Sequence, residues 1–251
     1  MERMNLLISD LDGTLLGDDE SLAQFAHWFA YARSCYRLVY SSGRFVESVL
    51  DSIQSTVLPE PDAIIGGVGT QIYDVARSRK FPMWPPLVIE WNPFIVQSIG
   101  EDFSELKLQP SKHNSQHKVS FYGEDLDESF LKHLGDRLAS KGQLVSLVYS
   151  SRRDLDVLPA KSNKGGAALY LTRRWKISAE RTLVAGDSGN DAAMFDAGFR
   201  GIVVGNATPE LKAMNSPAIY LAKGCFAAGV LEGIQYWQAR NVSSQQTRVR
   251  N

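Results

Sequence analysis

Short apolar runs alternate with helically periodic segments through the first third of the 251-residue chain. Each apolar run is long enough for one strand and ends at polar or glycine-rich residues, which is typical of buried strands. The helical segments place apolar side chains three and four residues apart, and Ser21 is the expected N-cap of the first one. Strands that alternate with helices across short connections predict a parallel sheet with right-handed crossovers. The predicted strands are 6–9, 36–40 and 63–65, and the predicted helices are 21–33 and 45–53.

A proline-rich stretch at residues 81–86 breaks this alternation and is predicted to link two units. Residues 87–156 then mix two predicted helices with two predicted strands, enough for a small open-faced α+β layer. Because the alternation then resumes, the expected fold class is α/β, a doubly wound parallel sheet with an inserted α+β domain. We expect the core at residues 1–80 and 160–251 and the inserted domain at residues 81–159. The further predicted helices are 92–102, 128–141, 164–173, 191–197 and 209–214, and the further strands are 118–122, 144–150, 182–185, 202–204 and 218–221.

Composition and charge narrow the class of protein. The chain is 44% hydrophobic and 22% charged, which predicts a globular protein and excludes collagen-like or wholly disordered chains. A net charge of -1 argues against nucleic acid or an anionic membrane as a partner, but leaves room for a small basic phosphate pocket. The distant cysteines Cys35 and Cys225 predict neither a disulfide nor a zinc site and favour a reducing, cytoplasmic location. No signal-peptide or membrane-spanning pattern is present, and the polar residues from Trp237 to Arg250 are expected to fray into a tail.

The residues with chemistry to offer follow the predicted strands of the core. Asp10 and Asp12 come directly after the first strand, and Asp187 and Asp191 follow a late one. Because ligands of parallel sheets bind past the carboxyl ends of the strands, these carboxylates and Lys164 are expected to meet at one edge. Clustered carboxylates repel one another unless a cation lies between them, and oxygen-only ligands favour Mg²⁺. The sequence therefore predicts metal-assisted phosphoryl chemistry at this edge.

Four segments carry a resemblance to a known superfamily. Asp10–Thr14 (Asp-Leu-Asp-Gly-Thr), Ser42–Arg44, Lys164 and Gly186–Asp191 stand in this order along the chain. They resemble the four motifs of the haloacid dehalogenase (HAD) superfamily of phosphatases, which implies a HAD-like, Rossmannoid core. The inserted domain is similar to the larger type of cap in that superfamily. The segments that resemble the narrower sucrose-phosphate phosphatase family are 67–73, 118–120, 149–159 and 163–165.

The resemblance implies a role for each residue of the core site. Asp10 would attack phosphorus and form an aspartyl-phosphate, while Asp12 would protonate the leaving sugar oxygen and later deprotonate the water. Ser42 would donate to a phosphate oxygen, and Lys164 would neutralise the charge that develops there. The implied Mg²⁺ ligands are Asp10, the backbone carbonyl of Asp12, Asp187 and Asp191, the last as a ligand or as the residue that orients water and Lys164.

The cap is expected to set specificity, because the core handles only phosphate and metal. Asp154 and Asp156 alternate with apolar residues, so both could project from one face of a strand toward a polyhydroxylated ligand. A second interpretation stays open, in which they cap this strand or pair with Arg152 and Arg153. The candidate substrate-binding residues are Lys118, Ser120, Tyr149, Ser150, Asp154 and Asp156 in the cap, and Ser42, Gly43, Arg44, Gly69, Thr70, Lys164 and Asn190 in the core.

The leading hypothesis is hydrolysis of sucrose 6-phosphate, and the alternative substrate is mannosylfructose phosphate, handled by a sister enzyme of the same architecture. Two other functions stay open. A non-catalytic sensor of sugar phosphate would not need Asp12, whereas a phosphomutase would need a cap that shields the aspartyl-phosphate from water. Calcium binding of the EF-hand type fails, because Ser21 and Gly198 stand where that loop requires glutamate. The sequence tests neither the oligomeric state nor an association with an upstream sugar-phosphate synthase.

Overall fold

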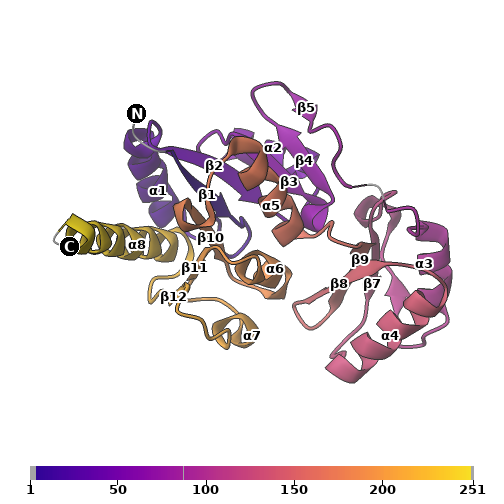
Figure 1. Cartoon of the computed structure of the whole chain (residues 1–251). Helices are drawn as coiled ribbons and strands as arrows, with labels where there is room; N and C mark the ends of the chain where they lie inside the picture. Colours follow the sequence, from indigo (N-terminus) through magenta and orange to yellow (C-terminus); the bar gives the residue numbers. More distant parts are fainter. Residues whose placement is uncertain (1–3, 87, 250–251) are drawn as a thin grey trace.

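The structure, a computed structural model, describes residues 4–86 and 88–249, with side chains described through residue 240. It contains two separate sheets (Figure 1). The larger sheet consists of β1 (Asn5–Ser9), β2 (Tyr36–Ser41), β3 (Ala63–Gly66), β4 (Gln71–Asp74), β5 (Arg79–Lys80), β10 (Thr182–Gly186), β11 (Arg200–Val203) and β12 (Ile219–Leu221). Its order is β12-β11-β10-β1-β2-β3-β4-β5, parallel from β12 to β3 and antiparallel over the last two pairs.

Helices cover this sheet and complete the core. On β1, Leu6, Leu7 and Ile8 are completely buried, as expected of a parallel strand covered on both faces. The helix at the start of the chain packs against the last helix, and the one that begins at Lys164 packs against its successor. The predicted α/β fold with a doubly wound parallel sheet is confirmed. The helices of this part are α1 (Asp19–Ala32), α2 (Val46–Ser55), α5 (Lys164–Trp175), α6 (Ala192–Asp196), α7 (Pro209–Lys212) and α8 (Phe226–Val249).

The start of α1 differs from the prediction. The helix begins at Asp19, and Asp18 rather than Ser21 is its N-cap. The Asp18 carboxylate accepts a hydrogen bond from the Ser21 backbone N–H at 2.8 Å. The prediction was wrong because it followed the first apolar residue, Leu22. The first turn instead carries Asp19 and Glu20, which the positive end of the helix dipole favours.

The predicted C-terminal tail is part of a helix. Helix α8 runs through Trp237 to Val249, so the expected fraying was wrong over the described residues, and Arg250 lies outside them. Trp237 is buried and donates from Nε1 to the Gly201 carbonyl at 3.1 Å. Within the two described ranges, no helix combines the length and the apolar character needed to cross a bilayer. The buried stripe of α8, at helical spacing, is Ala227, Val230, Ile234 and Trp237.

The smaller sheet is antiparallel and two helices cover one of its faces. These helices pack with Phe121 and Leu155 in a separate apolar cluster. Because side chains alternate along a strand, the neighbours Ser120, Asp154 and Asp156 lie on the opposite face. Two strands of this sheet are not among the predicted ones: β6, whose two residues carry no periodicity, and β9, which was considered only as a possible strand around Asp154 and Asp156. The elements, with the sheet in the order β6-β7-β9-β8, are β6 (Lys107–Leu108), β7 (Val119–Tyr122), β8 (Val145–Ser150), β9 (Asp154–Pro159), α3 (Pro93–Glu101) and α4 (Glu128–Ser140).

The proline-rich linker is fastened to the larger unit. Phe81 is buried in the main apolar cluster, against the Tyr170 ring. Trp84 donates from Nε1 to the Gly69 carbonyl at 2.9 Å, and the Tyr170 hydroxyl donates to the Pro82 carbonyl at 2.9 Å. These contacts hold the linker against α5 and against the glycine turn that follows β3 (Gly67–Gly69).

Candidate active site

Lys164 lies at the centre of the polar cluster past the carboxyl ends of β1 and β10. It is the first residue of α5, whose N-cap Asn163 accepts a hydrogen bond from the Gly166 N–H. Its Nζ is completely buried and donates to Oδ1 of Asp10 at 2.7 Å, of Asn190 at 2.6 Å and of Asp191 at 2.7 Å. One ammonium group thus joins the start of α5 to two loops that are far apart in sequence, the loop after β1 and the loop after β10.

The carboxylates around this lysine form a site that fits a divalent cation. Oxygens of Asp10, Asp187 and Asp191 lie within 4.8 Å of one another, and Oδ2 of Asp10 is buried without a hydrogen-bond partner. Burial raises the pKa of Asp10, and the attraction of Lys164 does not offset it fully. Burial alone would lower the pKa of Lys164, but the nearby carboxylates raise it above its usual value. Three carboxylates against one lysine leave negative charge that a cation would neutralise.

Asp187 makes cation binding dependent on pH. Burial, and then repulsion from Asp191, raises its pKa from 3.8 to about 6. Without metal, protonated Asp187 therefore contributes to the stability of the folded protein below pH 3.8, and this contribution is lost as the pH rises through about 6. Below about pH 6, a cation must displace the proton of Asp187 in order to bind. We expect the stabilisation by Mg²⁺ to be small about one pH unit below this pKa and to level off about one unit above it.

Urea unfolding with and without Mg²⁺ across this pH range measures the effect. The same series on an Asp187→Asn variant is the control, since its Mg²⁺ response should be weak and should lose the step near pH 6. If Mg²⁺ raised the free energy of unfolding of the unmodified protein by the same amount at every pH, the assignment of Asp187 as a Mg²⁺ ligand would be contradicted.

Asp12 and Arg44 face one another at the mouth of the site. Asp12 is exposed, and its Oδ2 lies 2.9 Å from Nε of Arg44, an ion pair without the alignment of a hydrogen bond. Ser42 is fully buried, and its Oγ accepts the backbone N–H of Arg44 at 3.0 Å. Since that bond uses Oγ as an acceptor, the hydroxyl proton of Ser42 stays available for a phosphate oxygen.

The glycine turn after β3 packs against the start of α5, where Lys164 lies. The buried Thr70 hydroxyl donates to the Gly67 carbonyl at 2.8 Å, which closes the turn. Gly69 has φ +106° and lies so close to the start of α5 that an added Cβ would stand 2.1 Å from the carbonyl carbon of Asn163. In this structure, Gly69 and Thr70 therefore position Lys164 and are not among the cavity-lining residues.

We expect Gly69→Ala to destabilise the protein by about 2–4 kcal/mol, from backbone strain together with a steric clash. Gly142 is a matched control, because its φ is +72° and a Cβ there would meet nothing within 4 Å. Gly142→Ala should therefore show the strain alone, about 1 kcal/mol. Urea unfolding measures both variants, and equal losses would show that the close approach to Asn163 carries no cost.

A cavity of about 300 Å³ lies between the core site and the polar face of the smaller sheet. It brings together most of the residues that the sequence singled out. Sequence reasoning missed Gln109, His113, Tyr122, Ser151 and Arg153, which also line it. Candidates that do not line it are Ser42, Gly69, Thr70, Ser120, Tyr149, Lys164, Asp187 and Asp191. The predicted residues that do line it are Asp10, Asp12, Gly43, Arg44, Lys118, Ser150, Asp154, Asp156 and Asn190.

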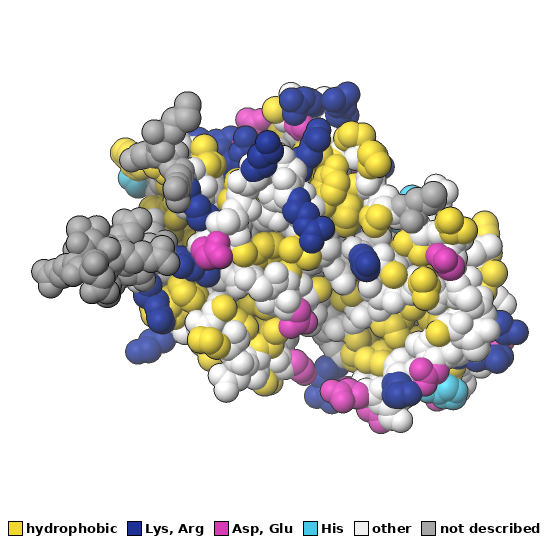
Figure 2. All heavy atoms as spheres, in the orientation of Figure 1, with side chains coloured by type: hydrophobic (Ala, Val, Ile, Leu, Met, Phe, Trp, Pro, Cys, Tyr) yellow, Lys and Arg dark blue, Asp and Glu magenta, His cyan; other side chains and the backbone are white. Residues whose placement is uncertain are grey.

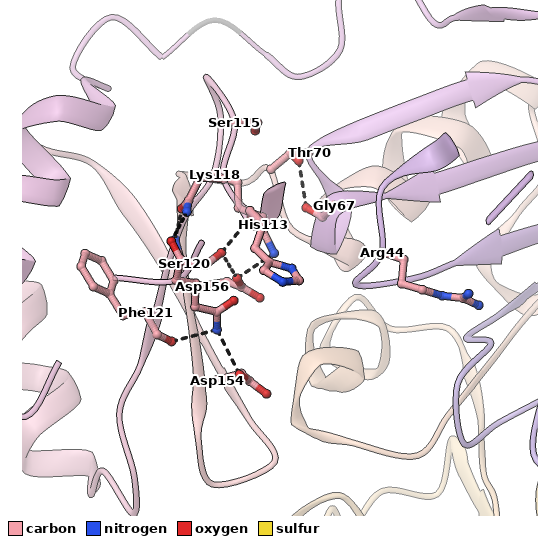
Figure 3. Close-up of polar contacts among 12 residues, drawn as sticks. Arg44, Gly67, Thr70, His113, Ser115, Lys118, Ser120, Phe121, Asp154 and Asp156 are labelled. Carbon is pink, nitrogen blue, oxygen red and sulfur yellow. Dashed lines mark hydrogen bonds and ion pairs between the residues drawn. The ribbon is translucent and has the colours of Figure 1, made fainter. Parts of the chain in front are cut away.

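Polar side chains of the cap converge on Asp156, opposite Arg44 (Figure 3). Its Oδ1 lies 2.8 Å from the Lys118 ammonium and accepts the Ser120 hydroxyl at 2.6 Å. Lys118 is itself buried and lies 5.7 Å from the ring centre of Phe45, a residue of the core. The ammonium therefore reaches from the cap to the core.

Asp154 lies at the more open end of the same face. Its Oδ1 accepts from Gln109 at 3.0 Å, and its Oδ2 pairs with Arg153 at 3.0 Å. Pairing with a neighbouring arginine, one of the interpretations left open above, is thus present for Asp154, whereas Arg152 pairs with Asp125. Both aspartates also line the cavity, so the two interpretations are compatible.

Tyr149 lies on the other face of the smaller sheet. Its hydroxyl donates to the Gly123 carbonyl at 2.9 Å and accepts the Leu126 N–H at 3.0 Å. The ring packs against the apolar cluster of the cap. It therefore fixes the Gly123–Leu126 connection.

Comparison with solved structures shows which fold the chain shares. The chain superposes on a HAD subclass IIB sugar phosphatase with a TM-score of 0.64 and 14% identity, over 84% of this chain and 91% of that one, which shows a shared fold. Together with the family and the relatives described next, this fold makes the chain a phosphatase of the HAD superfamily, a phosphoric monoester hydrolase.

More narrowly, the chain belongs to the sucrose-6F-phosphate phosphohydrolase family, whose model matches residues 3–238. It is 33% identical to the sucrose-phosphatase of Synechocystis, solved in complex with sucrose and phosphate, with a TM-score of 0.88 over 94% of this chain and 98% of that one. It is 32% identical to mannosylfructose-phosphate phosphatase of Agrobacterium fabrum over 94% of this chain and 98% of that protein. A probable sucrose-phosphatase of Arabidopsis thaliana is 33% identical over 95% of this chain, which spans 62% of the plant protein.

Proposed function

We propose that this protein hydrolyses a disaccharide phosphate, sucrose 6-phosphate foremost, to the free sugar and phosphate with Mg²⁺ as cofactor. The observation that carries the proposal is that one cavity is lined both by Asp10 and Asp12 and by the polar cap residues around Asp156. A phosphate at the core end would leave its sugar beside hydroxyl-binding groups at the cap end. The relatives named for sucrose phosphate and mannosylfructose phosphate support the same substrate class.

In the proposed reaction the Asp10 carboxylate attacks phosphorus, and the bond from phosphorus to the sugar oxygen breaks. Asp12 gives its proton to the leaving sugar oxygen and then takes one from the water that hydrolyses the aspartyl-phosphate. Asp12 suits this work because it is exposed at the cavity mouth, while the buried Asp10 is held by Lys164. Ser42 and Lys164 would stabilise the charge on the phosphate oxygens.

The Mg²⁺ ion would be held by Asp10, Asp187 and Asp191 together with the backbone carbonyl of Asp12. When bound, it would supply positive charge beside the transferring phosphoryl group. The unpartnered Oδ2 of Asp10 supports this assignment. Asp191 also accepts the backbone N–H groups of Asp187 and Ser188 through Oδ2, at 3.0 and 3.2 Å, and so orients the metal-binding loop.

The cap residues would recognise the sugar. Lys118, Asp154 and Asp156 combine donors and acceptors on one face, and Ser120 fixes the orientation of Asp156. Gly43, Arg44, Ser150 and Asn190 line the remaining wall of the cavity and complete the substrate-binding set in the proposal. Gln109 and His113, which the sequence did not single out, extend it.

Replacement of one cap carboxylate should affect the disaccharide selectively. We expect Asp156→Asn to lower kcat/KM for sucrose 6-phosphate by about 10–100-fold, because a charged hydrogen bond is worth about 1.5–3 kcal/mol. Hydrolysis of p-nitrophenyl phosphate, which has no sugar, should change little. Asp125→Asn is the matched control, since Asp125 belongs to an exposed ion pair. Equal losses on both substrates would remove Asp156 from sugar recognition.

We also propose that the protein is divided into a core of residues 1–80 and 160–251 and a cap of residues 81–159. In this proposal the protein is cytoplasmic. Its ligand is a small sugar phosphate rather than nucleic acid or membrane. A sugar-phosphate synthase would supply the substrate and could associate with the protein. Mannosylfructose phosphate is the second candidate substrate, favoured by the relative of which this chain covers 98%.

The test is release of inorganic phosphate by the purified protein with Mg²⁺ from four compounds: sucrose 6-phosphate, mannosylfructose phosphate, trehalose 6-phosphate and a monosaccharide phosphate. We expect the fastest release from sucrose 6-phosphate. A preference for mannosylfructose phosphate would select the second candidate, and binding without release would favour a non-catalytic sensor. Isomerised sugar phosphate without release would favour a phosphomutase.

A further inference from the structure

Two adjoining hollows of about 370 and 390 Å³ lie at the amino-terminal end of the core strands, the end opposite Asp10. Arg37, Asp74, Arg77 and Trp175 line both, so the hollows form one groove, called the basic groove below. Figure 2 shows Lys and Arg side chains gathered over the β4–β5 hairpin, at the top of the view. The groove shares no lining residue with the cavity of the active site.

The charge of the groove is one-sided. Six cations and three carboxylates line it, in a chain whose net charge is only -1. Two of the carboxylates are already paired, Asp62 with Arg33 at 2.8 Å and Asp74 with Arg77 at 2.7 Å. Glu60 is then the one carboxylate that remains against four cations. These cations are Arg37, Arg79, Lys80 and Arg174.

Helix dipoles explain only part of this charge. Arg174 lies in the last turn of α5, where a cation offsets the negative end of the helix. Arg37 comes from β2 and lies over the ring of Trp175, the last residue of the same helix, whereas Arg79 and Lys80 come from strand β5. Arg79 and Lys80 are both exposed on β5, the edge strand of the larger sheet. Their charge is therefore available to something outside the chain.

Two aromatic side chains supply the main apolar surface of the groove, whose lining is otherwise largely polar. Phe81 is buried there, and Trp175 is half-buried with the Arg37 guanidinium 4.6 Å from its ring centre. None of the unpartnered buried polar atoms of the described side chains lies in this groove. Small-molecule sites depend on such converging polar groups, whereas exposed cations around apolar side chains are typical of electrostatically steered protein contacts.

We propose that the basic groove docks an acidic peptide segment of another protein, with carboxylates against Arg79, Lys80 and Arg174 and an apolar side chain against Phe81 and Trp175. Charge complementarity selects an acidic partner. Because the groove lies at the opposite edge of the sheet from Asp10, a docked partner leaves the active-site cavity open. The protein can therefore act on its substrate while it is bound.

Fluorescence anisotropy of a labelled oligo-glutamate peptide with one central leucine tests this proposal. Its binding is compared among the unmodified protein, an Arg79→Glu/Lys80→Glu variant and a Lys107→Glu/Lys141→Glu variant. The control pair reverses the same number of exposed charges on the cap, outside the groove. Release of phosphate serves as the check that both variants are folded.

We expect the groove variant to bind the peptide at least about tenfold more weakly and the control variant to bind it within about twofold of the unmodified protein. Affinity should also fall as salt is raised, because the contact is electrostatic. Equal weakening in both variants would show non-specific attraction and overturn the proposal. Displacement of the peptide by ATP at equal concentration would make the groove a small-anion site and would overturn it as well, as would the absence of binding.

Discussion

An Asp10→Asn variant should lose turnover almost completely while keeping its fold. We expect kcat to fall by about 10⁴-fold or more, because the amide cannot attack phosphorus and no second nucleophile stands in its place. The free energy of unfolding should not fall, since burial already disfavours the charged form of Asp10 and an amide oxygen can still accept from Lys164. Phosphate release and urea unfolding measure the two effects.

The control for this variant is its mass, because slow deamidation of the new asparagine would regenerate the nucleophile. The peptide that contains residue 10 should be intact by mass spectrometry after the assay. A variant of confirmed mass with kcat within about tenfold of the unmodified enzyme would rule out the covalent route through Asp10.

Lys164→Met should impair both stability and catalysis. Removal of the ammonium leaves Asp10 and Asp191 buried without their cation, and breaking a buried pair in this way costs about 3–5 kcal/mol. The loss of charge stabilisation on the phosphate oxygens should lower kcat by about 10²–10³-fold. Mg²⁺ should recover part of the lost stability, because it supplies positive charge to the same carboxylates.

Lys132→Met is the matched control, since Lys132 pairs with Asp136 on the exposed face of α4 and both side chains are mostly exposed. Its stability should change by no more than about 1 kcal/mol. Urea unfolding with and without Mg²⁺ compares the two variants. Similar losses of unfolding free energy in both variants would show that the buried cluster contributes no more to stability than an exposed ion pair does.

The core half of the site could be predicted from sequence because most of its segments begin directly after a strand. Asp10 and Ser42 come one residue after β1 and β2, and parallel strands end at the same edge of the sheet. Long-range contacts were therefore implied by short local patterns. Lys164 was also identifiable, because it opens a helix after a helix-capping asparagine.

The cap half was harder to predict because antiparallel register decides which side chains reach the cavity. Ser150 pairs with Asp154 on the polar face, whereas Tyr149 pairs with Leu155 on the face that the helices cover. The hydroxyl of Tyr149 made it a candidate, but the alternation along β8 turns it away. Gln109 and His113 lie in the connection between β6 and β7, His113 at the end of a three-residue 3-10 helix, and this connection carries no periodicity, so only the folded structure reveals them.

We propose that the cap and the core together select a disaccharide phosphate. The most direct test is the ratio of kcat/KM for sucrose 6-phosphate to kcat/KM for glucose 6-phosphate, measured by phosphate release in Mg²⁺ buffer. We expect a ratio of at least about 10², because a monosaccharide cannot make the hydrogen bonds that the second sugar ring would make with the polar cap residues around Asp156. A ratio near one, or a faster reaction with the monosaccharide, would contradict it.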